Sequence, residues 1–226
     1  MSLTTSPSKF GNLAELIDSL GGIPLERIRV DPPLGTGTID DIVSIEEKEG
    51  RLCEMIEGVL VEKTMGYFES EIAVLLAAAL IQFVKKNDLG VVTGEGGMIL
   101  FPGNQVRIPD VAFVSWERFL EAEAEGQSVP ELVPDLAVEV LSPGNSAGEM
   151  SLKLEVYFRA GVRLVWYVDP VAKSVTVYTS VNRSKVIPLE GTLDGGKVLP
   201  GFELPVRDLF AAKKSRSNKN GHRGKR

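Results

Sequence analysis

Two acidic residues interrupt short apolar segments of this sequence. Asp110 lies within VRIPDVAFV (residues 106–114) and Glu139 within DLAVEVL (residues 135–141). An ionised carboxylate that leaves water without a partner is strongly destabilising, so each charge needs compensation. One divalent cation would compensate both, and hard ions such as Mg²⁺ prefer oxygen ligands. We therefore expect Asp110 and Glu139 to bind Mg²⁺ (or Mn²⁺), with the backbone carbonyl of Val140 as a further ligand.

The same pattern has a second interpretation that needs no metal. Asp110 follows Pro109 and could begin a turn, and Glu139 could face solvent from a half-exposed strand. The pattern of the two segments alone leaves both interpretations open.

Lys153 lies in the next predicted helix, residues 147–160. Its ammonium group could orient or help deprotonate a water that attacks a phosphodiester, and could stabilise negative charge on the phosphorus oxygens. Glu149 stands four residues earlier, however, and this spacing predicts a surface ion pair worth roughly 0.3–0.5 kcal/mol. By spacing alone, the ion pair is the favoured interpretation.

A third acid could come from the long predicted helix, about residues 68–86. Glu69 precedes Ile72 by three residues and so lies on the side of the apolar stripe, from which it could point inward. Glu71 is the alternative. Acids in a first helical turn also interact favourably with the helix dipole, and this interpretation stays open.

A competing motif is rejected. Residues 144–148 spell G-x-S-x-G between a predicted strand and helix, the context of a hydrolase nucleophile. The sole histidine, His222, lies in a basic tail, so Ser146 has no base to activate it. Ser146 is better explained as the helix N-cap, with Glu149 completing a capping box. The sequence contains no P-loop and no cluster of Cys and His, which disfavours nucleotide-dependent and zinc chemistry.

Charge is unevenly distributed along the 226 residues. The net charge is −6, but residues 213–226 hold seven of the 25 basic residues, and the remainder has 18 basic and 31 acidic residues. Such an acidic body repels nucleic acid unless a metal or a basic patch intervenes. The single cysteine, Cys53, excludes an internal disulfide, and no signal segment is evident, so we expect a cytoplasmic protein.

The order of predicted elements indicates an α/β (α+β) fold with a mixed sheet flanked by helices. The predicted strands and helices, in order, are a hairpin over 51–63 centred on Glu57 and Gly58, a helix over 68–86, strands over 91–101 and 105–114, a short helix near 116–126, a strand over 135–141, a helix over 147–160 and a hairpin over 163–180. We expect residues 1–50 to be a lead-in with one short helix, 51–212 to be the main domain and 213–226 to be disordered.

Several motifs in order give the sequence a family resemblance. The strings CEMIEGVLVEK, RIPDVAFV and PDLAVEVLSPGNSAGEMSLKLEVYFRAGVRLVWYVDP resemble the Uma-two family, to which restriction endonuclease activity is ascribed. The resemblance, from about residue 51 to 209, implies a PD-(D/E)XK nuclease fold and a Mg²⁺-dependent endonuclease that acts on DNA. The first acid then falls on Asp110 and the second on Glu139.

The resemblance also assigns roles to other positions. Leu141 stands where many nucleases of this fold have lysine, and the family's lysine falls on the next helix, at Lys153. The early-helix acid falls on Glu69, where many members have histidine, and Tyr157 matches the family tyrosine. A homodimer would suit an enzyme that cuts both strands. A catalytically inactive domain that binds DNA or protein is the alternative function.

Overall fold

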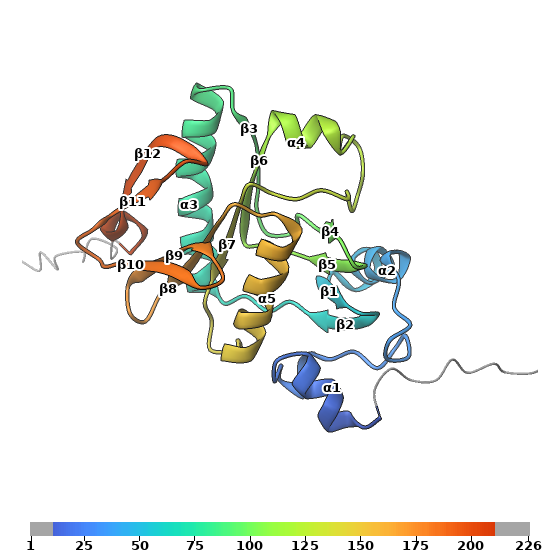
Figure 1. Ribbon diagram of the computed structural model, residues 1–226. Helices are drawn as coiled ribbons and strands as arrows, with labels where there is room; N and C mark the ends of the chain where they lie inside the picture. The colour runs from blue at the N-terminus through green and yellow to red at the C-terminus, as the bar shows by residue number, and fades with distance from the viewer. Residues whose placement is uncertain (1–10, 211–226) are drawn as a thin grey trace, which may run out of the picture.

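A mixed six-stranded sheet forms the centre of the protein (Figure 1). The computed structural model describes residues 11–210. The strand order is β10-β9-β8-β7-β6-β3, with β3 (Gly90–Thr93), β6 (Val111–Ser115), β7 (Leu136–Val140), β8 (Leu164–Asp169), β9 (Ser174–Ser180) and β10 (Arg183–Ile187). Strands β7 and β8 are parallel, and the other neighbours are antiparallel. The predicted fold class is confirmed.

The two long helices cover opposite faces of this sheet. Helix α3 (Tyr67–Lys86) lies on one face and α5 (Ala147–Ala160) on the other (Figure 1). Successive strand residues point to opposite faces, so Val138 packs in the core beneath α3 whereas Ala137 packs beneath α5. Helix α3 is long and apolar enough to cross a membrane by length and composition, yet one side of it packs in this core.

A second, four-stranded sheet stands beside the first. Its order is β2-β1-β5-β4, with β1 (Cys53–Ile56), β2 (Val59–Glu62), β4 (Ile99–Phe101) and β5 (Gln105–Arg107). The predicted hairpin is confirmed as β1-β2, and its turn residues Glu57 (φ 52°) and Gly58 (φ 77°) both have the positive φ of a tight hairpin turn. Helix α2 (Ile39–Glu49), which we did not predict, packs on this sheet through Ile42 and Ile45.

The prediction of single strands over 91–101 and 105–114 is wrong. Each segment is broken, so that β3 and β6 join the central sheet while β4 and β5 join the second one. Gly94, Gly96 (φ 96°) and Gly97 turn the chain between β3 and β4. Between β5 and β6 stands Pro109, which has no N–H to donate to a ladder. Asp110 therefore lies at the junction of the two sheets.

The remaining elements complete both cores. They are α1 (Leu13–Ser19), the 3₁₀ turn η1 (Leu25–Arg27), α4 (Trp116–Glu121), β11 (Thr192–Gly195), β12 (Leu199–Pro205) and η2 (Val206–Leu209). The β11-β12 hairpin packs beside α3 through Leu193, Leu199 and Phe202. The predicted basic tail, residues 213–226, lies outside the described residues.

Candidate active site

Six charged side chains meet where the two sheets adjoin. They are the acids Glu54, Asp110 and Glu139 and the bases Lys63, Arg107 and Lys153, which we call the acid–base cluster. Each of these side chains is at most 7% exposed. Side chains of these types are almost never buried without partners, so the contacts within the cluster decide what it can do.

Strand register sets Asp110 against Glu139. Val111 of β6 pairs with Val138 of β7, and one further step along this antiparallel register places Asp110 opposite Glu139. The Asp110 N–H donates to the Val138 carbonyl at 3.0 Å and continues the ladder. Both acids follow the alternation that turns Ala112 and Ala137 toward α5. Because both are buried, the interpretation of Glu139 as a solvent-facing residue is wrong.

Both oxygens of Asp110 accept short hydrogen bonds. Lys63 Nζ lies 2.6 Å from Asp110 Oδ1 and 2.7 Å from the Ile108 carbonyl. The Val140 N–H donates to Asp110 Oδ2 at 2.6 Å. Val140, which was expected to offer its carbonyl to a metal, thus holds the carboxylate of Asp110 in place through its amide.

Lys153 lies between two carboxylates. Its Nζ is 3.2 Å from Glu139 Oε2 and 2.9 Å from Glu54 Oε1. One turn further along α5, the hydroxyl of Tyr157 donates to Glu139 Oε1. The prediction of a surface ion pair between Lys153 and Glu149 is wrong, because the side of α5 that carries Lys153 faces the sheet.

Glu149 has a different partner, Arg27. The two side chains form a double hydrogen bond with both distances 2.9 Å, and Arg27 also donates to the Gly144 carbonyl at 3.1 Å. Ser146 is the N-cap of α5, as predicted, and accepts from the Glu149 N–H. The predicted capping box is incomplete, since the Glu149 carboxylate turns to Arg27 instead of the N-cap. His222, which we rejected as a base for Ser146, lies outside the described residues.

Glu54 was not among the site residues that we predicted, although the sequence pattern around it could have identified it. It stands between the buried residues Cys53 and Met55 of β1, the same pattern of an acid within an apolar strand that singled out Glu139. It accepts from the Ile108 N–H at 3.1 Å and from Arg107 Nη1 at 3.2 Å, in addition to Lys153. Glu54 therefore holds two of the three bases of the cluster.

Burial and pairing move the pKa values of the cluster in different directions. Burial raises the pKa of Glu54, but Lys153, Arg107 and Lys63 outweigh it and lower the pKa to about 2. For Glu139, burial is the largest effect and exceeds the attraction of Lys153 and Lys63, so its pKa is raised. Burial lowers the pKa of Lys153, but Glu139 and Glu54 raise it more, so Lys153 stays an ammonium ion at neutral pH.

Glu69 does not join the cluster. It lies in the first turn of α3, half-buried, and its carboxylate folds back toward Gly66 at the start of the helix. It lines a groove with Phe68, Val171 and Phe210, and Glu71 is exposed. Within residues 11–210, no contact connects Glu69 to Asp110 or Glu139, and its position matches the helix-dipole interpretation.

Asp110 and Glu139 have carboxylate oxygens of the kind that Mg²⁺ prefers, and all four oxygens already accept from other groups of the protein. No group of three or more His, Cys, Asp or Glu side chains within residues 11–210 could hold a metal. Mg²⁺, however, commonly uses only one or two protein carboxylates and keeps several waters. The oxygens of Asp110 and Ile108 already hold one cation, the Lys63 ammonium. Asp110 and Glu139 could therefore share a Mg²⁺ ion if Lys63 moves off Asp110 and Glu139 turns one oxygen away from Lys153 or Tyr157.

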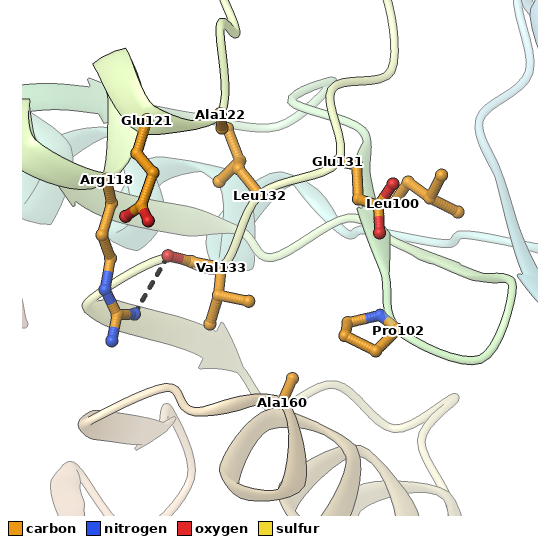
Figure 2. A pocket seen from close by; sticks show the side chains of 9 residues that line it. All are labelled: Leu100, Pro102, Arg118, Glu121, Ala122, Glu131, Leu132, Val133 and Ala160. Carbon is orange, nitrogen blue, oxygen red and sulfur yellow. Dashed lines mark hydrogen bonds between the residues drawn. The ribbon is translucent and has the colours of Figure 1, made fainter.

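The hollow of about 420 Å³ drawn in Figure 2 is a separate feature. It lies between α4, the segment before β7 and the end of α5, where Arg118 donates to the Val133 carbonyl at 3.0 Å (Figure 2). No residue of the acid–base cluster lines it. Its single basic side chain is engaged with backbone carbonyls, so it offers no comparable chemistry.

Comparisons with known proteins give a matching family and a similar solved structure. The model of the Uma2 family, described as "Putative restriction endonuclease", matches residues 39–207. The chain belongs to the Uma2 family. A crystal structure titled as a putative nuclease belonging to DUF820, from Anabaena variabilis ATCC 29413, superposes with a TM-score of 0.66 at 23% identity. The match covers 77% of this Uma2 chain and 97% of that one, and shows a shared fold. No curated protein matches the chain significantly.

Proposed function

We propose that this Uma2 protein is a Mg²⁺-dependent (or Mn²⁺-dependent) endonuclease that hydrolyses DNA. The observation that carries the proposal is the placement of Asp110 opposite Glu139, with the Lys153 ammonium 3.2 Å from Glu139. Asp110 and Glu139 would hold the metal. When bound, the ion would polarise a phosphoryl oxygen and lower the pKa of a bound water.

Lys153 would act as a positive charge in this reaction. Because its pKa is raised, it cannot accept a proton from water at neutral pH. Its ammonium group would instead stabilise the negative charge that develops on the phosphate oxygens. Glu54 would be a positioning residue that holds Lys153 and Arg107, and Tyr157 would fix the carboxylate of Glu139.

The charge balance of the cluster points to an anionic substrate. Three acids face three bases, so a divalent ion adds positive charge that a phosphodiester would neutralise. The segment Thr64–Gly66 directly follows Lys63, and the segment Ser142–Ser146 begins two residues after the end of β7. Both segments are partly exposed. We place the approach of the phosphodiester between these segments.

Metal removal tests the proposal. The full chain is expected to nick or linearise supercoiled plasmid DNA with Mg²⁺ or Mn²⁺, to be inactive in EDTA, and to recover when the metal is restored. A structured RNA of similar length, assayed in parallel, tests the preference for DNA. Cleavage that persists in EDTA would contradict the metal mechanism.

A catalytically inactive nuclease-like domain that binds DNA or protein is the second candidate. It is favoured by the full mutual compensation of the three acids and three bases, and by the position of Glu69 away from them. Failure to cleave any nucleic acid with either ion, in a preparation that still binds DNA, would support this candidate.

Lys63→Met is expected to enlarge the stabilisation that Mg²⁺ gives to the protein. The change removes the ammonium that competes for Asp110 and leaves a buried carboxylate in need of a cation. We expect the rise in Tm on addition of Mg²⁺ to be larger in Lys63→Met than in the wild type, since a ligand that binds the folded state stabilises it according to its affinity. Lys48→Met, at an exposed lysine of α2, is the matched control. Equal Mg²⁺-induced shifts in all three proteins would show that Lys63 does not occupy the metal position.

A further inference from the structure

Residues 13–28, which carry α1 and η1, are packed against the rest of the protein (Figure 1). Leu20 and Ile23 are buried in one apolar cluster with side chains of β2. Gly21 touches Gly148 in the first turn of α5, because a Cβ on Gly148 would lie only 2.5 Å from the Gly21 carbonyl oxygen. The segment therefore joins β2 to the start of α5.

Arg27 makes the polar contacts between this segment and the rest of the chain. It is 6% exposed, and its guanidinium binds the end of β2, the loop after β7 and the first turn of α5. Nε donates to the Glu62 carbonyl at 3.0 Å and Nη1 to the Gly144 carbonyl at 3.1 Å. Both Nη atoms donate to the Glu149 carboxylate at 2.9 Å. Within residues 11–210, four of the five N–H groups of Arg27 thus have acceptors.

Two of these contacts lie next to lysines of the acid–base cluster. Lys63 directly follows Glu62, and Lys153 stands about one helical turn after Glu149. Their ammonium groups lie 2.6 Å and 3.2 Å, respectively, from the two carboxylates that are proposed to hold the metal. The guanidinium of Arg27 therefore ties together the two backbone segments from which these ammonium groups extend.

The third contact lies at the proposed approach of the phosphodiester. A Cβ on Gly144 would lie 3.4 Å from Thr64 Oγ1, so the two segments that flank this approach lie side by side at Gly144. Arg27 holds the Gly144 carbonyl, and Asn145 Nδ2 donates to the Glu149 carboxylate at 3.3 Å. The pair of Arg27 and Glu149 thus anchors the loop after β7 to α5 and to the end of β2.

We propose that Arg27 is a positioning residue of this site, which fixes β2 relative to α5 and hence the places of Lys63 and Lys153. Arginine suits this role because its planar fork of N–H groups binds several acceptors in fixed directions. The match to the family model begins at residue 39, so it assigns no role to Arg27. Any effect of Arg27 on cleavage rests on the proposed nuclease function, whereas its effect on the two lysines does not.

The ¹H–¹⁵N signals of the ammonium groups of Lys63 and Lys153 test this role in the full chain without DNA. Both groups are buried in ion pairs, so their protons should exchange slowly with water and give resolved signals in the wild type. Lys63→Met assigns the first signal. Arg27→Met is expected to shift or broaden both signals. Unchanged signals in Arg27→Met, or the absence of both signals from the folded wild type, would overturn the proposal.

Arg118→Met is the matched control. Arg118 also joins distant segments through backbone carbonyls, and it does so at the other end of α5. It donates to the carbonyls of Val133, Pro134 and Gly161, each at 3.0 Å. Its replacement should lower the Tm as the loss of Arg27 does, but it should leave both ammonium signals in place.

Arg27→Lys separates the geometry of Arg27 from its charge. The variant keeps a positive charge beside the buried Glu149 and so spares the fold, but one ammonium cannot replace the fork that binds Glu62, Gly144 and Glu149 together. We expect both ammonium signals to shift in this variant too. Wild-type signals in Arg27→Lys would mean that Arg27 only neutralises Glu149, and would contradict the positioning role.

Cleavage kinetics test the consequence for catalysis. With plasmid DNA and Mg²⁺, Arg27→Met is expected to lower kcat by about tenfold or more and to change KM by less than about threefold, since a misplaced Lys153 acts on the reaction step. Arg118→Met should keep the kcat of the wild type per folded molecule. Equal kcat values in the two variants would refute a catalytic effect of Arg27. A wild type that cleaves nothing would instead contradict the proposed function, and the ammonium signals would still decide the role of Arg27.

Discussion

Replacing Lys153 with methionine is expected to lower the free energy of unfolding by about 3–5 kcal/mol, because two buried carboxylates lose the cation they share. Glu54 keeps Arg107 and the Ile108 N–H, whereas the one hydrogen-bond donor that Glu139 keeps within residues 11–210 is the hydroxyl of Tyr157. Glu139 therefore bears most of the cost. For a domain of this size the change corresponds to a fall in Tm of roughly 6–20 °C.

The loss of unfolding free energy in Lys153→Met should be larger at high pH than at low pH. The pKa of Glu139 is raised in the folded protein, so its ionisation opposes folding as the pH rises above its unfolded value of about 4.3. Without Lys153 the pKa of Glu139 rises further, and the variant should recover part of its stability as the pH falls from 8 toward 5. The pKa of Glu54 is shifted in the opposite direction, so its effect on stability has the opposite pH dependence. Its pKa of about 2 stabilises the fold at neutral pH, and this contribution is lost as the pH falls from about 4.3 toward 2.

Thermal and urea unfolding at pH 8 and pH 5 measure the stability loss in Lys153→Met and its pH dependence, and unfolding of the wild type between about pH 4 and pH 2 measures the contribution of Glu54. Lys48→Met, which removes an exposed lysine, should change the free energy of unfolding by less than about 0.5 kcal/mol. A Lys153→Met protein as stable as this control at pH 8 would show that the buried pairs do not form. A loss that is larger at pH 5 than at pH 8 would contradict the raised pKa of Glu139.

Asp110→Asn and Glu139→Gln are each expected to reduce Mg²⁺-dependent cleavage by at least about 100-fold, because each removes a proposed metal ligand. The fold should survive both changes. Glu139→Gln keeps a side chain of the same size, and it removes an ionised group whose burial is unfavourable. This variant should therefore be about as stable as the wild type without metal, or slightly more stable.

Asp135→Asn is the matched control for the loss of cleavage. Asp135 is fully buried immediately before β7, where it accepts from the Ser115 N–H at 2.6 Å and from Arg163 at 2.5 Å. Its replacement removes a buried carboxylate outside the acid–base cluster, so it should cost stability but not metal-dependent turnover per folded molecule. If Asp110→Asn and Glu139→Gln cleave plasmid at the rate of this control, neither acid holds the catalytic metal.

The sequence predicted the elements of the central sheet better than the contacts at the site. A carboxylate within an apolar strand is a local signal, and it pointed to Asp110 and Glu139. It also holds for Glu54, which we overlooked because the hairpin β1-β2 carries no other sign of chemistry. The partner of Glu149 could not be read from spacing, since Arg27 lies 122 residues away along the chain.

The break at Pro109 explains why the site could be only partly predicted. Proline has no N–H to donate to a ladder, yet we predicted one strand through Pro109, and the sequence did not show that the chain passes there from one sheet to another. That crossing brings Glu54, Lys63 and Arg107 from the second sheet to the carboxylates of the first. Pairings between distant strands depend on tertiary packing, which local residue patterns do not encode.

Asp110 and Glu139 together are proposed to hold one divalent cation. Anomalous diffraction from crystals of the wild type grown with Mn²⁺ and a DNA oligonucleotide tests it most directly. We expect a manganese peak within about 2.0–2.3 Å of a carboxylate oxygen of each residue, with the Lys63 ammonium displaced from Asp110. A manganese peak elsewhere, with Lys63 still bound to Asp110, would contradict it.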